Sequence, residues 1–150
     1  MKNLTLAALF ALGSALPAFA ADRITKTSPH SVADTLDRLE AAVTDAGATV
    51  FARVDHAKGA QGVDMDLRPT SLLIFGNPKL GTPAMLDSQT AGLDLPLRVL
   101  AYEGADGNVQ VVYHDPAQLA EDHGLPMDAE YLTMMTGALD KLTSKAVAAE

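Results

Sequence analysis

Apolar residues recur at helical spacing in the segment that follows Ser31. Their separations of four, three, four and three residues place them on one helix face: Val32, Leu36, Leu39, Val43 and Ala46. Ser31 is a favourable N-cap, and Gly47 is placed to end the helix in a left-handed turn. The pattern predicts a long amphipathic helix between these two residues.

A second helical pattern occupies the C-terminal segment, from about Pro126 to Ala148. Pro126 suits a first helical turn, because the N–H that it lacks would have no partner there. One apolar stripe follows the helical period: Tyr131, Met135, Leu139 and Leu142. We expect both Met134 and Met135 to pack in the core rather than to bind a metal or a partner.

Three segments predict strands of different burial. Residues 22–27 predict a short first strand with Ile24 turned inward. Residues 71–75 (Ser-Leu-Leu-Ile-Phe) do not alternate, so they predict a central strand covered on both faces. Residues 49–55 alternate, which is typical of a half-buried strand with opposite side chains on its two faces: Val50, Ala52 and Val54 against Phe51 and Arg53.

Two further strand patterns, at residues 97–103 and 108–114, flank the sequence Gly104-Ala105-Asp106-Gly107. Its Asp-Gly pair is typical of a hairpin turn. The inward side chains are expected in one of two alternating sets, of which the first is Leu97, Val99 and Ala101 opposite Val109, Val111 and Tyr113.

The elements therefore run in the order strand, helix, a group of strands rich in hairpins, helix. This segregation predicts an α+β fold with an antiparallel sheet covered on one face by helices. No repeat, low-complexity stretch or linker divides residues 21–150, so we expect them to form a single domain.

The N-terminal segment has the three parts of a secretory signal peptide. Lys2 supplies the positive region, residues 4–16 the apolar run, and Ala18-Phe19-Ala20 the cleavage pattern before Ala21. A transmembrane anchor is the alternative, but Pro17 ends the run short of the roughly 20 apolar residues that an anchor needs. We expect a periplasmic or secreted protein, free of the membrane after cleavage.

Composition narrows the function classes. The chain has no cysteine, which excludes disulfides, lipid attachment at a cysteine and thiolate chemistry. Cleavage removes Lys2 and leaves ten basic and nineteen acidic residues, a net charge of −9. This charge repels phosphate backbones and anionic lipid, so we expect no nucleic-acid partner.

The segment 76–82, Gly-Asn-Pro-Lys-Leu-Gly-Thr, is the most distinctive candidate for a site. We expect a loop here that joins a buried strand to a short helix over Pro83–Gln89. It has the glycine spacing of a phosphate loop but lacks the lysine before the hydroxyl residue, so it does not predict nucleotide binding. Two interpretations remain: structural turns and caps, or contacts to a small ligand by Gly76, Asn77, Gly81 and Thr82.

Asp55 and His56 stand together where a predicted strand ends. A histidine needs an orienting partner to act as a base or ligand, and we considered three: Asp115, Glu103 and Tyr113. The alternative is a histidine that is merely exposed or structurally satisfied, since adjacent residues of an extended chain point to opposite faces.

The remaining signals for chemistry are weak. The four histidines lie far apart, without the short spacing of a metal site, so we expect no metal and no cofactor. A site built from His56, His114 and a carboxylate is the one alternative. The run Glu121-Asp122-His123 predicts a solvated helix end, and there is no Gly-x-Ser-x-Gly motif for a nucleophile.

Several motifs occur together in the middle of the chain: Val54-Asp55-His56-Ala57, Leu67-Arg68-Pro69-Thr70, Phe75-Gly76-Asn77-Pro78, Gly81-Thr82-Pro83-Ala84-Met85, Leu93-Asp94-Leu95-Pro96-Leu97-Arg98 and Tyr113-His114-Asp115-Pro116. In this order they resemble domain-of-unknown-function family 302 (DUF302), over roughly Ser31 to His123.

The resemblance implies a β-α-β(4)-α fold like that of the TATA-box-binding protein and assembly as a homodimer. The family has no established activity, so no catalytic residue is implied. Its signature falls on these positions: His56, Gly76, Asn77, Pro78, Gly81, Thr82, Arg98 and Asp115. His114 departs from it, because family members usually carry a smaller polar residue there.

Three hypotheses follow. The leading one is a non-enzymatic domain that binds a small ligand or partner between the Asp55-His56 strand end and the 76–82 segment. The second is a hydrolytic or metal-assisted enzyme that uses His56 with Asp115 or Glu103. The third is a structural or dimerising module whose signature segments serve folding only.

Overall fold

The computed structural model describes residues 23–149. The predicted signal peptide and Asp22, the first residue of the first predicted strand, lie outside this range. Within it, no helix is long and apolar enough to cross a membrane.

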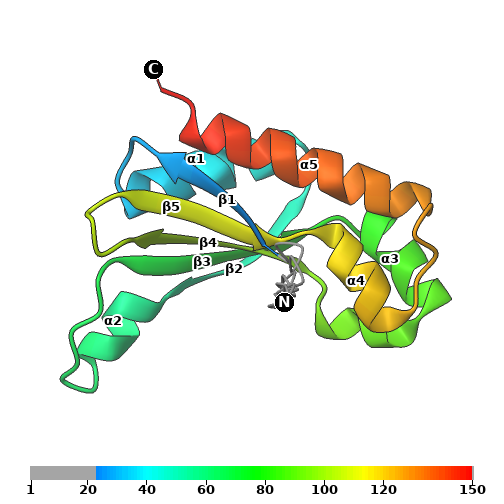
Figure 1. The fold of residues 1–150 in the computed structure, drawn as a ribbon, viewed down its shortest axis with the longest axis horizontal. Coiled ribbons are helices and arrows are strands. Elements are labelled where there is room, and N and C mark those ends of the chain that lie inside the picture. The colour runs from blue at the N-terminus through cyan, green and yellow to red at the C-terminus, as the bar shows by residue number, and fades with distance from the viewer. Residues whose placement is uncertain (1–22, 150) are drawn as a thin grey trace, which may run out of the picture.

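The centre of the fold is a five-stranded antiparallel sheet in the order β1-β5-β4-β3-β2. Its strands are β1 (Arg23–Ser28), β2 (Thr49–Asp55), β3 (Thr70–Gly76), β4 (Leu97–Glu103) and β5 (Val109–His114). Two long helices, α1 (Val32–Asp45) and α5 (Glu130–Val147), lie on the same face of the sheet (Figure 1). The predicted α+β class and the one-sided helical cover are confirmed.

Shorter helical segments lie between these elements, and the sequence predicted only one of their bounds, the helix end at residues 121–123. They are α2 (His56–Gln61), α3 (Pro78–Asp87), η1 (Gln89–Leu93) and α4 (Pro116–His123). Apart from them, the chain runs as one strand, one helix, four strands and one helix. Figure 1 shows α2 projecting from one end of the sheet, while α3 and α4 gather at the other end.

The first predicted helix, α1, forms between the two capping residues that the sequence indicated. The Ser31 hydroxyl accepts a hydrogen bond from the backbone N–H of Asp34 at 3.1 Å, and Gly47 takes the left-handed conformation with φ +73°. Val32, Leu36, Leu39 and Val43 are buried as expected. Ala46 is exposed instead, because the helix ends at Asp45 and its last turn buries Ala42.

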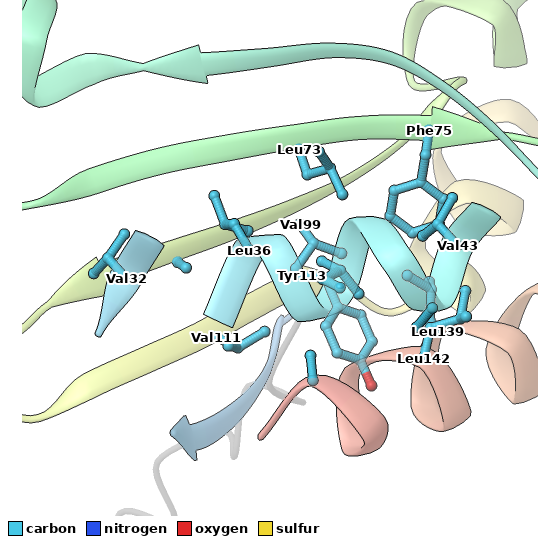
Figure 2. Packing of buried hydrophobic residues seen from close by; sticks show 14 of the residues in the cluster. Val32, Leu36, Val43, Leu73, Phe75, Val99, Val111, Tyr113, Leu139 and Leu142 are labelled. Carbon is cyan, nitrogen blue, oxygen red and sulfur yellow. The ribbon is translucent and has the colours of Figure 1, made fainter. Parts of the chain in front are cut away.

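The core lies between the two long helices and one face of the sheet. Figure 2 shows side chains from α1, β3, β4, β5 and α5 interlocking there: Val32, Leu36, Val43, Leu73, Phe75, Val99, Val111, Tyr113, Leu139 and Leu142. The predicted hairpin is confirmed, since Gly104 N–H donates to Asn108 O at 2.8 Å and Gly107 has φ +78°. Of the two alternating sets, the first faces the core.

The prediction that β3 is covered on both faces is wrong. Ser71, Leu73 and Phe75 are buried beneath the helices, but Leu72 and Ile74 are only half-buried on the opposite face. This second face, which we call the open face, is not covered by any helix of the described chain. The uninterrupted apolar run of β3 therefore includes two side chains that no helix of the described chain covers.

The predicted alternation along β2 is also wrong, because a bulge at Phe51 interrupts it. Val50 pairs with Phe75 and Ala52 with Ile74, so Phe51 has no partner on β3. Past the bulge, Ala52 and Val54 turn to the open face. Arg53 instead reaches α1 and forms an ion pair with Asp37.

The C-terminal helix begins later than predicted. Residues 126–129 form a turn, in which Ala129 N–H donates to Pro126 O at 3.0 Å, and α5 starts at Glu130. Tyr131, Met135, Leu139 and Leu142 are buried as expected. Met134 is wrongly predicted as a core residue, because it lies off this stripe with half of its surface exposed (50 %).

Candidate functional site

The register of β2 on β3 separates the two segments that were expected to form one site. Asp55 pairs with Ser71 at the start of β3, whereas Thr49 pairs with Gly76 at its end. The five residue steps from Ser71 to Gly76 span about 17 Å at the rise of an extended strand. A single site between the Asp55-His56 strand end and the 76–82 segment is therefore excluded.

At the first of these ends, Asp55 and His56 begin α2. The Asp55 carboxylate accepts a hydrogen bond from Lys58 N–H at 2.9 Å, so it caps the helix. His56 is exposed, and its side chain forms no hydrogen bond with another residue of the described range. Local capping therefore accounts for Asp55, while His56 occupies the first position of α2.

The three partners considered for His56 lie elsewhere. Glu103 is at the same end of the sheet, but β3 separates β2 from β4 by about 10 Å. Asp115 lies at the opposite end, where it caps α4 through a hydrogen bond from Ala117 N–H at 2.9 Å. Tyr113 is a core residue, only 3 % exposed (Figure 2). The structure does not bring these candidates together.

The same geometry separates the two histidines of the alternative metal site. His56 begins α2, whereas His114 ends β5 at the other end of the sheet. Among residues 23–149, no three histidine, aspartate or glutamate side chains are grouped to hold a metal ion.

At the second end, residues 78–82 are helical rather than part of a loop, and Gly76 still belongs to β3. The Asn77 side chain accepts a hydrogen bond from Lys79 N–H at 3.0 Å, and Pro78 occupies the first position of α3. Gly81 and Thr82 therefore lie inside the helix and do not cap a later one. Pro83 is tolerated within α3 at the loss of one backbone hydrogen bond.

This start of α3 forms one wall of a pocket of about 280 Å³. The pocket has no charged side chain among the residues that line it: Phe51, Gly76, Asn77, Pro78, Leu80, Gly81, Thr82, Met85, Leu95, Pro96, Leu97 and Met135. Four predicted ligand residues, Gly76, Asn77, Gly81 and Thr82, are brought together here. We call it the apolar pocket.

Close backbone approach explains Gly76 in this wall. A Cβ atom there would stand 3.3 Å from Pro96 Cβ and 3.6 Å from Phe51 Cε2. Glycine thus lets the Phe51 ring and Pro96 close over the end of β3. Phe51 is available for this because the bulge frees it from the pairing of β2, and its ring remains 57 % exposed.

A second cavity of about 300 Å³ adjoins the first and shares Leu97 with it. Polar and charged side chains line this cavity, including Asp94, Arg98, His114, Asp115 and Asp122. Beyond the Leu100–Val112 pair, no further pairing joins the start of β4 to the end of β5, and the cavity opens there.

His123 is the residue that sequence reasoning misjudged most. α4 ends at His123, as the charged run predicted, but the His123 side chain is only 7 % exposed and is therefore not solvated. Nε2 lies 2.8 Å from Oδ2 of Asp94 and Nδ1 lies 3.0 Å from the Thr90 hydroxyl, which ties α4 to η1 and to the residue after it. Arg98 donates to the other Asp94 oxygen at 2.6 Å.

These contacts set the protonation of Asp94. The hydrogen bond from His123 is the main cause that lowers the pKa of Asp94, and Arg98 adds to it, against an opposing effect of burial. A carboxylate accepts only, so His123 Nε2 carries the hydrogen of this bond.

A third polar contact ties α5 to α3 beside the apolar pocket. The Tyr131 hydroxyl donates to Oδ2 of Asp87 at 2.8 Å. Burial of the ring and the neighbouring carboxylate raise the pKa of Tyr131 to about 12. The proton of this phenol is therefore held firmly at neutral pH.

Comparison with solved structures supports the architecture. The fold is similar to the crystal structure of an uncharacterized conserved protein DUF302 from Bacillus stearothermophilus, with a TM-score of 0.68. The likeness covers 85 % of this chain and 97 % of the other, at 19 % sequence identity.

Among curated proteins, the chain is similar to part of two Brucella proteins. It is 47 % identical over 116 residues to "Fluoride-specific ion channel FluC 1" of Brucella suis biovar 1 (strain 1330), covering 76 % of this chain and 46 % of that protein. The protein of the same name from Brucella abortus biovar 1 (strain 9-941) matches at 47 % identity over 43 % of its length. The chain thus spans less than half of these relatives.

The family profile described as "Domain of unknown function DUF302" matches residues 24–142. That range holds all five strands but the first residue of β1, and nearly all of the residues described above. The chain therefore belongs to the DUF302 family.

Proposed function

We propose that this protein is a non-enzymatic binding domain that holds a small apolar molecule in the apolar pocket, outside the cytoplasm. The observation that carries the proposal is the convergence of Gly76, Asn77, Gly81 and Thr82 on one pocket. Residues that the sequence singled out as one segment thus line one cavity with mainly apolar walls.

The size and lining of the pocket support binding. Ligand pockets in proteins begin at roughly 300 Å³ and combine apolar walls with a few polar groups. Here Asn77 and Thr82 supply the polar groups among mainly apolar side chains. No titratable side chain is among the lining residues, so the pocket offers no acid, base or charged nucleophile.

The test blocks the pocket at Gly81. A Cβ atom there would stand 3.7 Å from Leu95 Cδ1, so Gly81→Leu directs a side chain towards the pocket. Gly137→Leu is the matched control, because a Cβ at this exposed position of α5 would meet nothing within 4 Å. Saturation-transfer NMR with 1-octanol and toluene should show binding to the wild type and to Gly137→Leu only. Equal transfer to a folded Gly81→Leu variant would overturn the proposal.

As a second candidate function, we propose that this domain modulates a fluoride-specific ion channel. The supporting observation is that the matched region forms part of the Brucella proteins named as fluoride-specific ion channels. The test measures fluoride efflux from vesicles. These vesicles contain a Brucella channel that lacks the matched region. The candidate predicts at least a twofold change in efflux when this chain is added, and an unchanged rate contradicts it.

We further propose that two copies associate through the open face, as a homodimer. Val54, Leu72, Leu100 and Val112 stand in register across four strands of this face. Five strands about 4.8 Å apart and about 20 Å long give a footprint of roughly 500 Å².

The α2 arm, residues 56–69, projects from the end of the sheet (Figure 1) and adds further exposed apolar side chains. It exposes Val63 and Met65 by 66 % each and Leu67 by 46 %. Stable interfaces bury roughly 800 Å² per partner, which the face and the arm approach together. A second copy is the favoured occupant because the same apolar strip can face itself across a twofold axis.

A further inference from the structure

We infer that the apolar pocket is built for an uncharged aromatic molecule of one or two rings that carries a single hydroxyl or carbonyl oxygen. This inference rests on the proposed binding function and names the ligand class of the same pocket. Four features carry it: lining charge, volume, the chemistry of the walls and the polar groups at the start of α3.

The lining requires a neutral ligand. All twelve lining residues are uncharged. An ionised ligand entering such walls would lose its hydration and gain no opposite charge in exchange. The charged side chains Asp94 and Arg98 line the neighbouring cavity instead, and they are paired with each other.

The volume limits the number of rings. An apolar cavity of about 150 Å³ takes up benzene. The apolar pocket, at about 280 Å³, is roughly twice as large. It therefore accommodates one substituted ring or two fused rings.

The walls favour an aromatic over an aliphatic occupant. Met85 and Met135 both line the pocket, and thioether sulfur makes favourable contacts with aromatic rings. Phe51 adds a ring whose face or edge can pack against another ring. This ring is more than half exposed in a position fixed by the β2 bulge and Gly76, so it gains burial when a ligand covers it.

Asn77 supplies the polar end of the site. Its Oδ1 accepts the hydrogen bond from Lys79 N–H, which fixes the amide orientation and leaves Nδ2 as a donor. Thr82 adds a hydroxyl, and no hydrogen bond of the described residues engages it. A hydroxyl or carbonyl oxygen of the ligand is the group that complements these donors.

The experiment uses methionine methyl groups labelled with carbon-13 as reporters of ring currents. The probes are 2-naphthol, 1-octanol and 2-naphthoate, of which the last carries a charge on the same rings. We expect 2-naphthol to shift the Met85 and Met135 methyl signals upfield. Met127 and Met134, which are 59 % and 50 % exposed and do not line the pocket, are the internal controls.

Affinities distinguish the ligand class from the binding function itself. We expect 2-naphthol to bind at least tenfold more tightly than 1-octanol or 2-naphthoate, and Phe51→Leu to weaken 2-naphthol about fivefold while sparing 1-octanol. If 1-octanol or 2-naphthoate binds as tightly as 2-naphthol, the inferred class is wrong and the proposed function stands. If no probe moves Met85 or Met135, the proposed function itself fails.

Discussion

The hydroxyl of Tyr131 donates a 2.8 Å hydrogen bond to Asp87, and this contact fastens the first turn of α5 to the last turn of α3. Both helices contribute to the apolar pocket, α5 through Met135 and α3 through Pro78, Leu80, Gly81, Thr82 and Met85. The bond therefore fixes the distance between two walls of the proposed site.

Replacing Tyr131 by phenylalanine tests how much this hydrogen bond contributes to the free energy of unfolding. The ring keeps its packing, while the hydrogen bond to a charged acceptor is lost. Because Asp87 is exposed and regains water, we expect Tyr131→Phe to lower the free energy of unfolding by about 1 kcal/mol. Urea denaturation at pH 7 measures it, and an unchanged midpoint would show that the contact adds nothing.

The raised pKa of Tyr131 predicts a loss of stability in alkali. A raised pKa means that the folded state favours the neutral phenol, so its contribution is complete below pH 10 and is lost as the pH rises towards about 12. The advantage of the wild type over Tyr131→Phe should thus be full at pH 9 and absent by pH 12. A constant difference across this range of urea midpoints would contradict the assignment.

Asp94 predicts the opposite dependence in acid. Its lowered pKa means that the folded state favours the carboxylate, so this contribution is present above pH 4 and is lost as the pH falls further. Asp94 is 44 % exposed, so we expect Asp94→Asn to cost only about 0.5 to 1 kcal/mol at pH 7. Thermal melts between pH 3 and pH 7 should show this cost fading in acid. Asp128→Asn, at an exposed position, is the control and should match the wild type.

Two alanine substitutions separate the pocket wall from the helix. Gly76→Ala places a Cβ 3.3 Å from Pro96 Cβ, so Pro96 and Phe51 must shift. We expect a loss of about 1 kcal/mol and weaker binding of 1-octanol. Gly81→Ala makes only ordinary contact at 3.7 Å and should stabilise α3 by about 0.5 to 1 kcal/mol. Equal effects of both changes on thermal stability would refute this account of Gly76.

The homodimer proposal predicts that a charge on the open face disperses the protein into monomers. Leu100 lies at the centre of that face, between Leu72 and Val112. Sedimentation should give a dimer for the wild type and a monomer for Leu100→Glu. Leu86→Glu is the matched control, since this leucine is already 81 % exposed on α3, and it should remain dimeric. A monomeric wild type at micromolar concentration would remove the proposal.

Periodic patterns predicted the elements that pack through repeated apolar positions. α1, the core-facing stripe of α5 and the β4–β5 hairpin follow from spacing and from turn residues such as Gly47 and Gly107, because each depends on neighbours in sequence. Where a long element has its own capping residues, tertiary contacts do little to change its type or its bounds.

Features that depend on partners distant in sequence were out of reach. The bulge at Phe51 exists only in the pairing of β2 with β3, and the alternation of residues 49–55 gave no sign of it. His123 lies in a charged run, yet its side chain is buried. It forms hydrogen bonds there with Asp94 and Thr90, which are about thirty residues away in sequence.

For the same reason, the sequence predicted one wall of the candidate site but not the rest of it. Gly76, Asn77, Gly81 and Thr82 stood out as a local motif, and the structure places all of them on one pocket. The opposite wall, from Leu95 to Leu97, and the floor at Met135 come from elsewhere in the chain. Only the register of β2 on β3 showed that His56 lies at the opposite end of β3 from this pocket.

The length of β3 also separates the pocket from a site at which the protein can be attached to a label or a surface. The hairpin turn at residues 104–107 lies at the end of the sheet remote from the pocket, and Ala105 is exposed there. Because the sequence contains no cysteine, Ala105→Cys would introduce a unique thiol. A dye or an electrode surface attached at that point would leave the pocket facing outward, which suits the domain to use as an oriented sensor layer.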